Sequence, residues 1–242
     1  MAEAVEAPGL TSFPAGAAVI LGASGGIGNA LAELLERSSR FSTVEKFSRK
    51  SEPPVDILDE ASLANAAALI SSRGAGLRLL IIATGILHDH DLRPEKSLRE
   101  ISPDAFAKSF AINAAGPALA IKHFAPLLPP QGKSLILALS ARVGSIGDNH
   151  LGGWYAYRAA KAALNQIVRT AAIEIARRKP EAICIAMHPG TVATGLTQPF
   201  AKNGLDVQSP QTAAAKILQA IDAMGPAQTG GFYDNRGEAI AW

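Results

Sequence analysis

The fold of this chain is decided by one stretch near its start, Ala17-Ala18-Val19-Ile20-Leu21-Gly22-Ala23-Ser24-Gly25-Gly26-Ile27-Gly28. Its apolar first half predicts a strand that is buried on both faces. A helical pattern follows, from about residue 27 to residue 38. Glycines between a strand and a helix let the backbone approach a pyrophosphate, and the helix N-terminus offers free N–H groups. The stretch therefore predicts a dinucleotide-binding turn, with an ordinary strand-to-helix turn as the alternative.

Strand and helix patterns alternate along the rest of the chain. We expect further strands at residues 43–47, 77–83, 134–139, 182–187 and 230–233, and helices at 60–72, 103–128, 154–178 and 210–223. Such alternation predicts an α/β fold, a single doubly wound, Rossmann-type parallel sheet with helices on both faces. No linker divides the chain, so residues 1–242 are expected to form one domain, with residues 1–14 as a poorly ordered N-terminal extension.

One region does not fit the regular alternation. Only seven residues separate Phe47 from Val55, too few for a helix that joins two parallel strands. Either residues 55–58 are a vestigial edge strand, or the sheet has lost a βα unit at this point.

Composition and charge exclude several classes of protein. Hydrophobic residues make up 48% of the chain and the net charge is +2, which excludes a disordered chain and gives no sign of a nucleic-acid partner. No run approaches 18 apolar residues, and the N-terminus lacks a basic region before an apolar one, so we expect neither a membrane span nor a secretory signal. The single cysteine, Cys184, predicts a buried, inert thiol and fits a cytoplasmic location.

Histidines do not form a recognisable metal site. His88 and His90 flank Asp89, but no matching further ligands follow at a suitable spacing. We therefore predict that the protein has no metal ion.

Tyr157 and Lys161 are the first catalytic candidates. Residues four apart share one face of a helix, so that the phenol and the ammonium project into the same cleft. A nearby ammonium, with an oxidised nicotinamide above it, favours the phenolate, and a tyrosine with a lowered pKa exchanges a proton with a carbonyl or an alcohol. The pair alone is a weak signal, because this spacing also arises by chance. Its place at the start of a long predicted helix, after a buried strand, strengthens the prediction.

With these motifs, the chain resembles the short-chain dehydrogenase/reductase family over nearly its whole length. The G-x-x-x-G-x-G spacing of Gly22, Gly26 and Gly28, together with Y-x-x-x-K, is typical of that family. Residues 139–146, 148–153 and 188–196 are most similar to its carbonyl-reductase and cell-contact-factor (C-factor) branch. The resemblance implies hydride transfer between NADPH and a carbonyl or alcohol substrate, with Tyr157 as general acid and base. It also implies a homo-oligomer, a dimer or a tetramer.

The resemblance adds two further catalytic candidates to Tyr157 and Lys161. Asn113 matches the asparagine that binds a water molecule next to the lysine, with a purely structural asparagine as the alternative. The family also has a pair of serines at the end of the preceding strand, the second of which binds the substrate oxygen. Here Ser140 is followed by Ala141. We expect Ser140 to take this role after a local backbone shift, with Ser145 as the second choice and a structural serine as the alternative.

The second predicted strand indicates which dinucleotide is bound. It ends in Lys46-Phe47-Ser48-Arg49-Lys50, with no acid to bind the ribose hydroxyl of NAD. Ser48 and Arg49 suit the 2′-phosphate of NADP, which favours NADP over NAD. A solvated basic turn is the alternative. The full set of predicted cofactor-binding residues is Gly22, Ser24, Gly25, Gly26, Ile27, Gly28, Ser48, Arg49, Asp56, Gly85, Asn113, Tyr157, Lys161, Pro189, Gly190, Val192 and Thr194.

Two further interpretations remain open at this point. The chain is either an NADP-dependent oxidoreductase or a dinucleotide-binding signalling or redox-sensing protein of the contact-factor type with little turnover. His188 is either a proton carrier or a histidine packed at a strand end. We expect residues 196–205 to form a loop that covers a small-molecule substrate.

Overall fold

The computed structural model describes residues 5–197 and 207–242. All its sheet strands are parallel and lie in the order β2-β1-β3-β4-β5-β6. The strands are β1 (Ala17–Leu21), β2 (Thr43–Phe47), β3 (Leu77–Ile82), β4 (Ser134–Leu139), β5 (Ala182–His188) and β6 (Phe232–Asp234). The predicted α/β fold with one parallel sheet is confirmed. The order reverses between β1 and β3, which is where such sheets open a crevice at their carboxyl ends.

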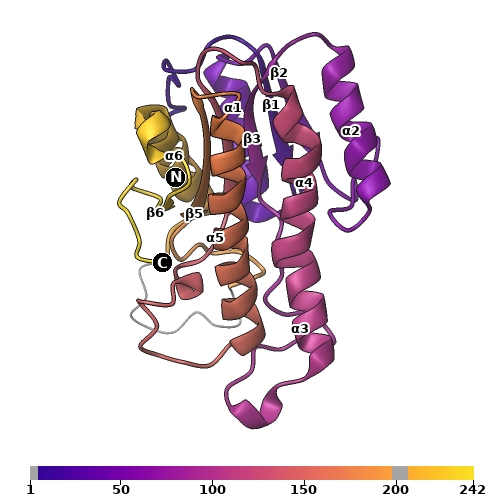
Figure 1. Ribbon diagram of the computed structural model, residues 1–242, viewed down its shortest axis with the longest axis vertical. Helices are drawn as coiled ribbons and strands as arrows, with labels where there is room; N and C mark the ends of the chain where they lie inside the picture. Colours follow the sequence, from indigo (N-terminus) through magenta and orange to yellow (C-terminus); the bar gives the residue numbers. More distant parts are fainter. Residues whose placement is uncertain (1–4, 198–206) are drawn as a thin grey trace.

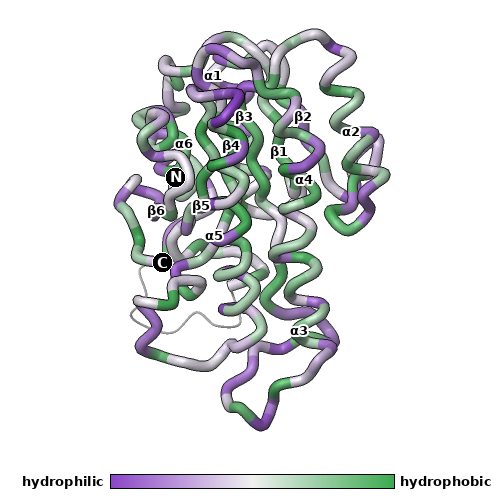
Figure 2. The backbone as a smooth tube through the Cα atoms, viewed as in Figure 1, coloured by the Kyte–Doolittle hydropathy of each residue, from purple (hydrophilic) through white to green (hydrophobic). Residues whose placement is uncertain are grey.

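Helices cover both faces of this sheet (Figure 1). They are α1 (Gly26–Ser38), α2 (Glu60–Ser72), α3 (Pro103–Phe110), α4 (Gly116–Phe124), α5 (Tyr155–Ala176) and α6 (Pro210–Ala223). One hydrophobic core joins α2, α4 and α5 to one face of the sheet, and a second core joins α1 and α6 to the other. In Figure 2 the central strands are mostly hydrophobic, while polar residues lie on the helix surfaces and in the loops.

The start of the chain differs from our expectation. Residues 1–4 lie outside the described residues, but the segment that follows is packed rather than loose. Leu10 and Phe13 are fully buried in the core on the α1–α6 side. Lys133 adds a polar anchor, since its Nζ lies 4.5 Å from the centre of the Phe13 ring and donates to Ser12 Oγ at 2.8 Å. Two apolar side chains thus fix part of the segment that we expected to be a poorly ordered extension.

The irregular region after β2 is a loop. Residues 55–58 form no strand, and β2 stands at the edge of the sheet. Val55 donates a main-chain hydrogen bond to Ser48 at 2.9 Å, which folds the loop back onto the end of β2. Of the two alternatives for this region, the edge strand at residues 55–58 is absent from the described structure, and no βα unit lies between β2 and α2.

The predicted helix at 103–128 is a rod with an irregular centre. A π-helical turn, Ala111–Ala115, joins α3 to α4, and the Gly116 N–H donates to Ala111 O, five residues earlier. Pro117 has no N–H to give to the carbonyl of Asn113, so a regular α-helical bond is absent there. Single π turns of this kind are frequent at functional sites, and this one carries Asn113.

Cys184 is fully buried on β5, as predicted. Burial raises the pKa of its thiol to about 12, which keeps the sulfur protonated and unreactive. Across residues 5–197 and 207–242, no helix has the length and apolar character needed to cross a bilayer.

Candidate functional site

A cavity of about 920 Å³ opens at the carboxyl ends of the central strands. Its wall combines the turn after β1, the ends of β3, β4 and β5, and the first turns of α5. The predicted site residues in this wall are Ser24, Gly25, Gly26, Ile27, Gly28, Gly85, Ser140, Tyr157, Lys161, Pro189, Gly190, Val192 and Thr194. The structure thus brings together residues that are spread over about 170 positions of the sequence.

The turn after β1 needs its glycines for two different reasons. Gly22 has φ +90°, and a Cβ there would lie 2.9 Å from the carbonyl carbon of Ala83. A Cβ on Gly28 would lie 2.3 Å from Gly22 O. Helix α1 begins with Gly25 as its N-cap, without a side-chain cap and without an acid in its first turn. Its first N–H groups therefore remain available to an anion in the cavity.

Tyr157 and Lys161 lie on the first turns of α5 and are buried, with 8% and 3% of their surfaces exposed. The Lys161 Nζ lies 5.8 Å from the centre of the Tyr157 ring and donates to Leu139 O at 2.9 Å. Burial lowers the pKa of Lys161 to about 8 and raises the pKa of Tyr157 above its usual range. Loss of solvation on burial causes the rise for Tyr157, a direction opposite to the one that we expect with an oxidised nicotinamide above the pair. A tyrosine that holds its proton suits the role of an acid.

Asn113 is fully buried and does not line the cavity itself. Its Oδ1 accepts from Ile86 N at 3.0 Å, and its Nδ2 donates to Ile86 O at 2.8 Å and to Ser109 Oγ at 3.3 Å. A Cβ on Gly85 would lie 3.2 Å from Asn113 Oδ1 and 3.6 Å from Lys161 Nζ. Gly85 thus lets the asparagine oxygen and the lysine ammonium approach the same point.

The serines after β4 are both buried, but they have different surroundings. Ser140 lines the cavity, and its hydroxyl donates to Asn165 Oδ1 at 2.7 Å. Ala141 also lines the cavity, at the position where the related family has its serine. Ser145 does not line the cavity, and its Oγ accepts from Asp148 N at 3.1 Å. Of the two predicted candidates, only Ser140 therefore reaches the wall of the cavity.

His188 ends β5 and lines the cavity beside charged groups. Its Nδ1 is buried and has no hydrogen-bond partner among the described residues. Burial and the Arg142 guanidinium lower the pKa of His188 to about 4, against the opposite effect of Asp234. The imidazole is therefore neutral near pH 7, which does not suit a carrier that must gain a proton there.

Four predicted cofactor residues lie outside the cavity wall besides Asn113. Gly22 begins the turn after β1, and its N–H donates to Phe47 O at 2.8 Å. Ser48 and Arg49 stand at the end of β2, where the Arg49 side chain is exposed and Ser48 Oγ accepts from Lys50 N at 3.1 Å. Asp56 lies in the loop before α2, and its Oδ1 accepts from Leu58 N at 2.9 Å. These residues lie toward the β2 edge, on the side where the adenosine half of a dinucleotide is expected.

Two residues near the site were missed by the sequence interpretation. Asn165 Oδ1 accepts the hydrogen bond of the Ser140 hydroxyl. Its spacing of four from Lys161 on the same helix was the sequence signal that could have placed it near the site. Arg142 joins the loop after β4 to two carboxylates, with Nη1 at 3.2 Å from Asp148 Oδ2 and Nη2 at 3.8 Å from Asp234 Oδ2. No sequence spacing indicated that second contact.

The predicted cover of the cavity is only partly described. Residues 196 and 197 line the cavity, whereas positions 198–205 of the expected substrate loop lie outside the described residues. Among residues 5–197 and 207–242, no three His, Cys, Asp or Glu side chains gather in an arrangement that could hold a metal ion.

Comparisons with known proteins agree with this architecture. The profile of the enoyl-(acyl carrier protein) reductase family matches residues 22–223. The 1-hydroxy-2-glutathionyl-2-methyl-3-butene dehydrogenase of Rhodococcus sp. (strain AD45) is 31% identical over 191 residues, which are 79% of this chain and 80% of the relative. The C-signal protein of Myxococcus xanthus is 31% identical over 147 residues, 60% of this chain and 84% of the relative.

A solved structure extends the comparison to the whole fold. The NADPH-bound carbonyl reductase from chicken fatty liver superposes with a TM-score of 0.83 at 22% identity, and the match covers 99% of this chain and all of the other. The shared fold includes the sheet and the helices on both of its faces.

Proposed function

Since the chain belongs to the short-chain dehydrogenase/reductase family, in the branch of the carbonyl reductases and the C-factor, we propose that it reduces a carbonyl group with NADPH and uses Tyr157 as the acid. The chain is an oxidoreductase of this family, and the finer assignment rests on one observation. Tyr157 and Lys161 share the wall of a single cavity with the glycine turn after β1. A proton donor and a dinucleotide-binding turn that face the same space are what a hydride transfer requires.

The residues around the turn fit a dinucleotide. Gly25, Gly26 and Ile27 place the uncapped start of α1 in the cavity wall, where its N–H groups suit a pyrophosphate. The missing side chain on Gly26 also leaves room beside Thr194, whose Cγ2 would lie 3.0 Å from a Cβ there. We assign the nicotinamide end to the region of Pro189, Gly190, Val192 and Thr194.

NADP is the form of the dinucleotide that we propose, with NAD as the weaker alternative. The end of β2 carries Ser48 and Arg49, and no acid stands there to bind a free ribose hydroxyl. The chicken carbonyl reductase with this fold was solved with NADPH bound. Both observations support a contact between the 2′-phosphate and the Arg49 guanidinium.

The proton chemistry follows from the burial of the pair. When bound, NADPH supplies the hydride for the carbonyl carbon. The phenol of Tyr157 gives its proton to the carbonyl oxygen, so that the product is an alcohol. The Lys161 ammonium, fixed on Leu139 O, stabilises the phenolate that remains until a proton returns from solvent. Asn113 keeps the neighbouring turn at Ile86 in place through two main-chain hydrogen bonds.

Ser140 is our candidate for the second contact to the substrate oxygen. It lines the cavity, but its single O–H donates to Asn165 in this structure. To bind a carbonyl oxygen, the hydroxyl must rotate away from that amide. Ser140 therefore contributes to the reaction only when its hydroxyl exchanges Asn165 Oδ1 for the carbonyl oxygen of the substrate.

The proposal is tested by titrating NADPH and NADH against the protein fluorescence, followed by a panel of aldehydes and ketones. Trp154 is a suitable reporter, because its ring centre lies 6.3 Å from that of Tyr157 at the cavity. We expect tighter binding of NADPH and turnover of at least one carbonyl compound. Binding without turnover across the panel would contradict the proposed activity.

That outcome would favour a second candidate, a dinucleotide-binding signalling or redox-sensing protein with little turnover. The specific observation in its favour is Ala141, which leaves the cavity wall without the hydroxyl typical of the family. The likeness to the C-signal protein points the same way. The buried Tyr157–Lys161 pair favours the enzyme, because a sensor has no need of a proton donor.

We also propose that the protein is a homo-oligomer, a dimer or a tetramer, located in the cytoplasm. The resemblance to the short-chain dehydrogenase/reductase family supports this proposal, and Ile173 on α5, with 49% of its surface exposed, is one apolar side chain that a second copy would cover. Light scattering at several protein concentrations tests the assembly.

A further inference from the structure

The start of α5 has an unusual backbone and no cap of its own. Gly152, Gly153 and Trp154 have φ values of +63°, +65° and +55° in succession. Trp154 is the N-cap, but its side chain makes no capping hydrogen bond, and no acid stands in the first turn. The first N–H groups of a helix need partners from elsewhere when they are buried. Ala156, the second residue of α5, is 2% exposed.

Glu95 supplies the missing partner from a distant part of the chain. Its side chain is buried, with 3% of the residue surface exposed, and its Oε1 and Oε2 accept from Ala156 N at 3.3 and 3.2 Å. Its main-chain oxygen also accepts from Trp154 N at 2.6 Å. A carboxylate at a helix N-terminus is stabilised by the helix dipole and by charge-assisted hydrogen bonds, which compensates for its burial.

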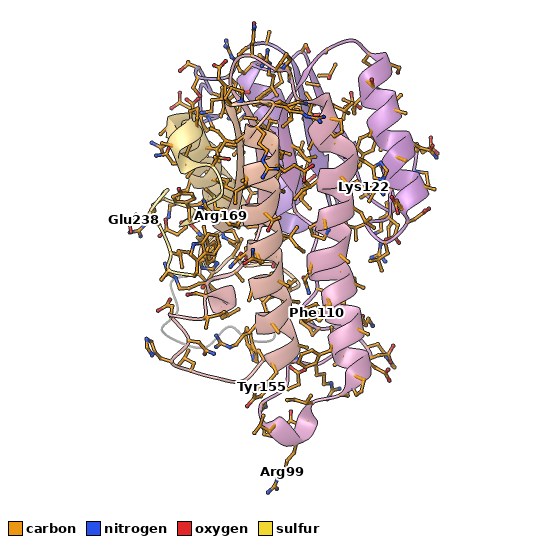
Figure 3. All side chains as sticks on the ribbon, in the orientation of Figure 1. Arg99, Phe110, Lys122, Tyr155, Arg169 and Glu238 are labelled. Atoms are coloured by element: carbon orange, nitrogen blue, oxygen red, sulfur yellow. The ribbon has the colours of Figure 1, made fainter. Side chains whose placement is uncertain are left out.

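The same residue, Ala156, is held through its carbonyl by the rod of α3 and α4. Ala156 O accepts from Ser109 Oγ at 3.2 Å, and Ser109 Oγ in turn accepts from Asn113 Nδ2. Glu95 and Ser109 therefore fix the N–H and the C=O of the residue directly before Tyr157. In Figure 3 the lower end of α5, marked by Tyr155, lies just above the short turn marked by Arg99, which follows the Glu95 segment.

We propose that Glu95 is a positioning residue for the reaction, which orients the phenol of Tyr157 by capping α5 through Ala156. The inference rests on the proposed function, since it assumes that Tyr157 is the proton donor. Glu95 is absent from the cavity wall, so it acts through the helix and not on the substrate. The first turn of α5 has no other side-chain cap, and a shift of the ring by about 1 Å is enough to lower a rate about 100-fold.

The test compares Glu95→Gln, Glu95→Met and Glu95→Ala in the full chain. Glutamine keeps an oxygen that accepts from Ala156 N. Methionine keeps the size of the side chain without such an oxygen, so it replaces the alanine variant if that protein does not fold. The matched control is Asp59→Ala, because Asp59 Oδ1 caps α2 by accepting from Ala61 N at 3.0 Å and is exposed. For each protein we would measure kcat, the KM values, the melting temperature and the hydrogen exchange of a peptide covering residues 154–157.

We expect Glu95→Met and Glu95→Ala to lower kcat about 10- to 100-fold, with the KM for NADPH within about 2-fold of the parent. Exchange at residues 154–157 should accelerate in both, and Glu95→Gln should restore most of kcat and of the protection. Asp59→Ala should lower the melting temperature with kcat unchanged. A loss of melting temperature without a loss of kcat in the Glu95 variants would overturn the proposal, and so would unchanged exchange.

The hydrogen-exchange measurement also separates this inference from the proposed function. If the parent protein reduces no carbonyl compound, the proposed function fails. If exchange at residues 154–157 still rises in Glu95→Met, the cap acts as described and only its link to catalysis is lost. If the parent is active and the Glu95 variants match it in kcat, the positioning role fails while the function stands.

Discussion

The hydroxyl of Ser140 donates to Oδ1 of Asn165 across 2.7 Å, from the end of β4 to the third turn of α5. Both residues are buried, with 4% and 2% of their surfaces exposed. The bond joins the end of β4, in the cavity wall, to the helix that carries Tyr157. It also engages the one hydroxyl hydrogen that Ser140 has, directly beside a position where alanine replaces the usual serine.

The first prediction concerns this serine. Ser140→Ala should lower kcat about 100-fold at saturating NADPH, because the substrate oxygen loses its second donor. Ser145→Ala should change kcat less than about 3-fold, since Ser145 lies outside the cavity wall and its Oγ accepts a hydrogen bond from Asp148 N. Ala141→Ser should raise kcat, because it adds a donor that need not exchange partners. Full activity of Ser140→Ala would show that Tyr157 acts without a serine, and would favour the weak or non-enzymatic role.

The second prediction concerns the proton donor. Tyr157→Phe should abolish carbonyl reduction, with a loss of about 100-fold to 10,000-fold in kcat, because the ring still packs but the proton is gone. Its affinity for NADPH should stay within about 2-fold of the parent, which fluorescence titration measures. Tyr155→Phe is the matched control, because this half-buried tyrosine of the same helix turn does not line the cavity. Turnover of Tyr157→Phe within a few-fold of the parent would exclude the phenol as the acid.

The third prediction concerns the choice of dinucleotide. Arg49→Ala should weaken NADPH by about 10-fold and leave NADH nearly unchanged, because only NADPH carries the phosphate that a guanidinium binds. The control is Arg93→Ala, which removes an exposed arginine from a loop outside the cavity wall. Equal losses for the two dinucleotides would show that Arg49 does not discriminate between them.

The fourth prediction concerns the buried ammonium of Lys161. Its pKa falls from the ordinary 10.5 to about 8 in the folded protein, so between these values the unfolded chain binds more protons. The free energy of unfolding should therefore rise with pH in that window and fall as the pH drops toward 8. Relative to Lys161→Met, the parent should gain at most about 1.4 kcal/mol per pH unit between pH 8 and 10.

Urea unfolding of both proteins at intervals across this range checks the fourth prediction. Lys133, whose pKa is also lowered to about 8 by burial, is common to both proteins and drops out of the difference. A difference in unfolding free energy that stays constant with pH would mean that Lys161 titrates as in the unfolded chain.

Much of the fold was readable from local patterns. The predicted bounds of β1 and β4 were confirmed to the residue, and so was the predicted helix start at residue 103, where Ser102 Oγ accepts from Ala105 N at 3.2 Å. These features depend on neighbours in the sequence, and periodicity records such neighbours. The burial of Leu10 and Phe13 was missed, because it depends on α1 and α6, which the local pattern does not show.

The candidate site was predictable where one helix or one turn carries it. The glycine turn and the Tyr157–Lys161 pair are of this kind, and both lie in the cavity wall. The partners that set their surroundings come from other elements. Glu95 caps α5 at Ala156, 61 positions further along the chain, and Asp234 approaches Arg142 from the edge strand β6. Such contacts follow from the packing of the whole domain, and a single sequence contains no spacing that reveals them.

The π-helical turn at residues 111–115 has a consequence for how this chain can change in length. A π turn holds one residue more than an α-helical turn, so removing one residue there would leave α3 and α4 in the phase of one α-helix, still without the hydrogen bond that Pro117 cannot donate. The packing of both ends would survive, but Asn113 would turn away from Ile86 and Gly85. A one-residue deletion in this turn would therefore preserve the packing of the two helices and alter the surroundings of Gly85 and Lys161. Among relatives of this protein, a one-residue gap in the alignment at residues 111–115 should distinguish chains without the buried asparagine side chain from chains that keep it.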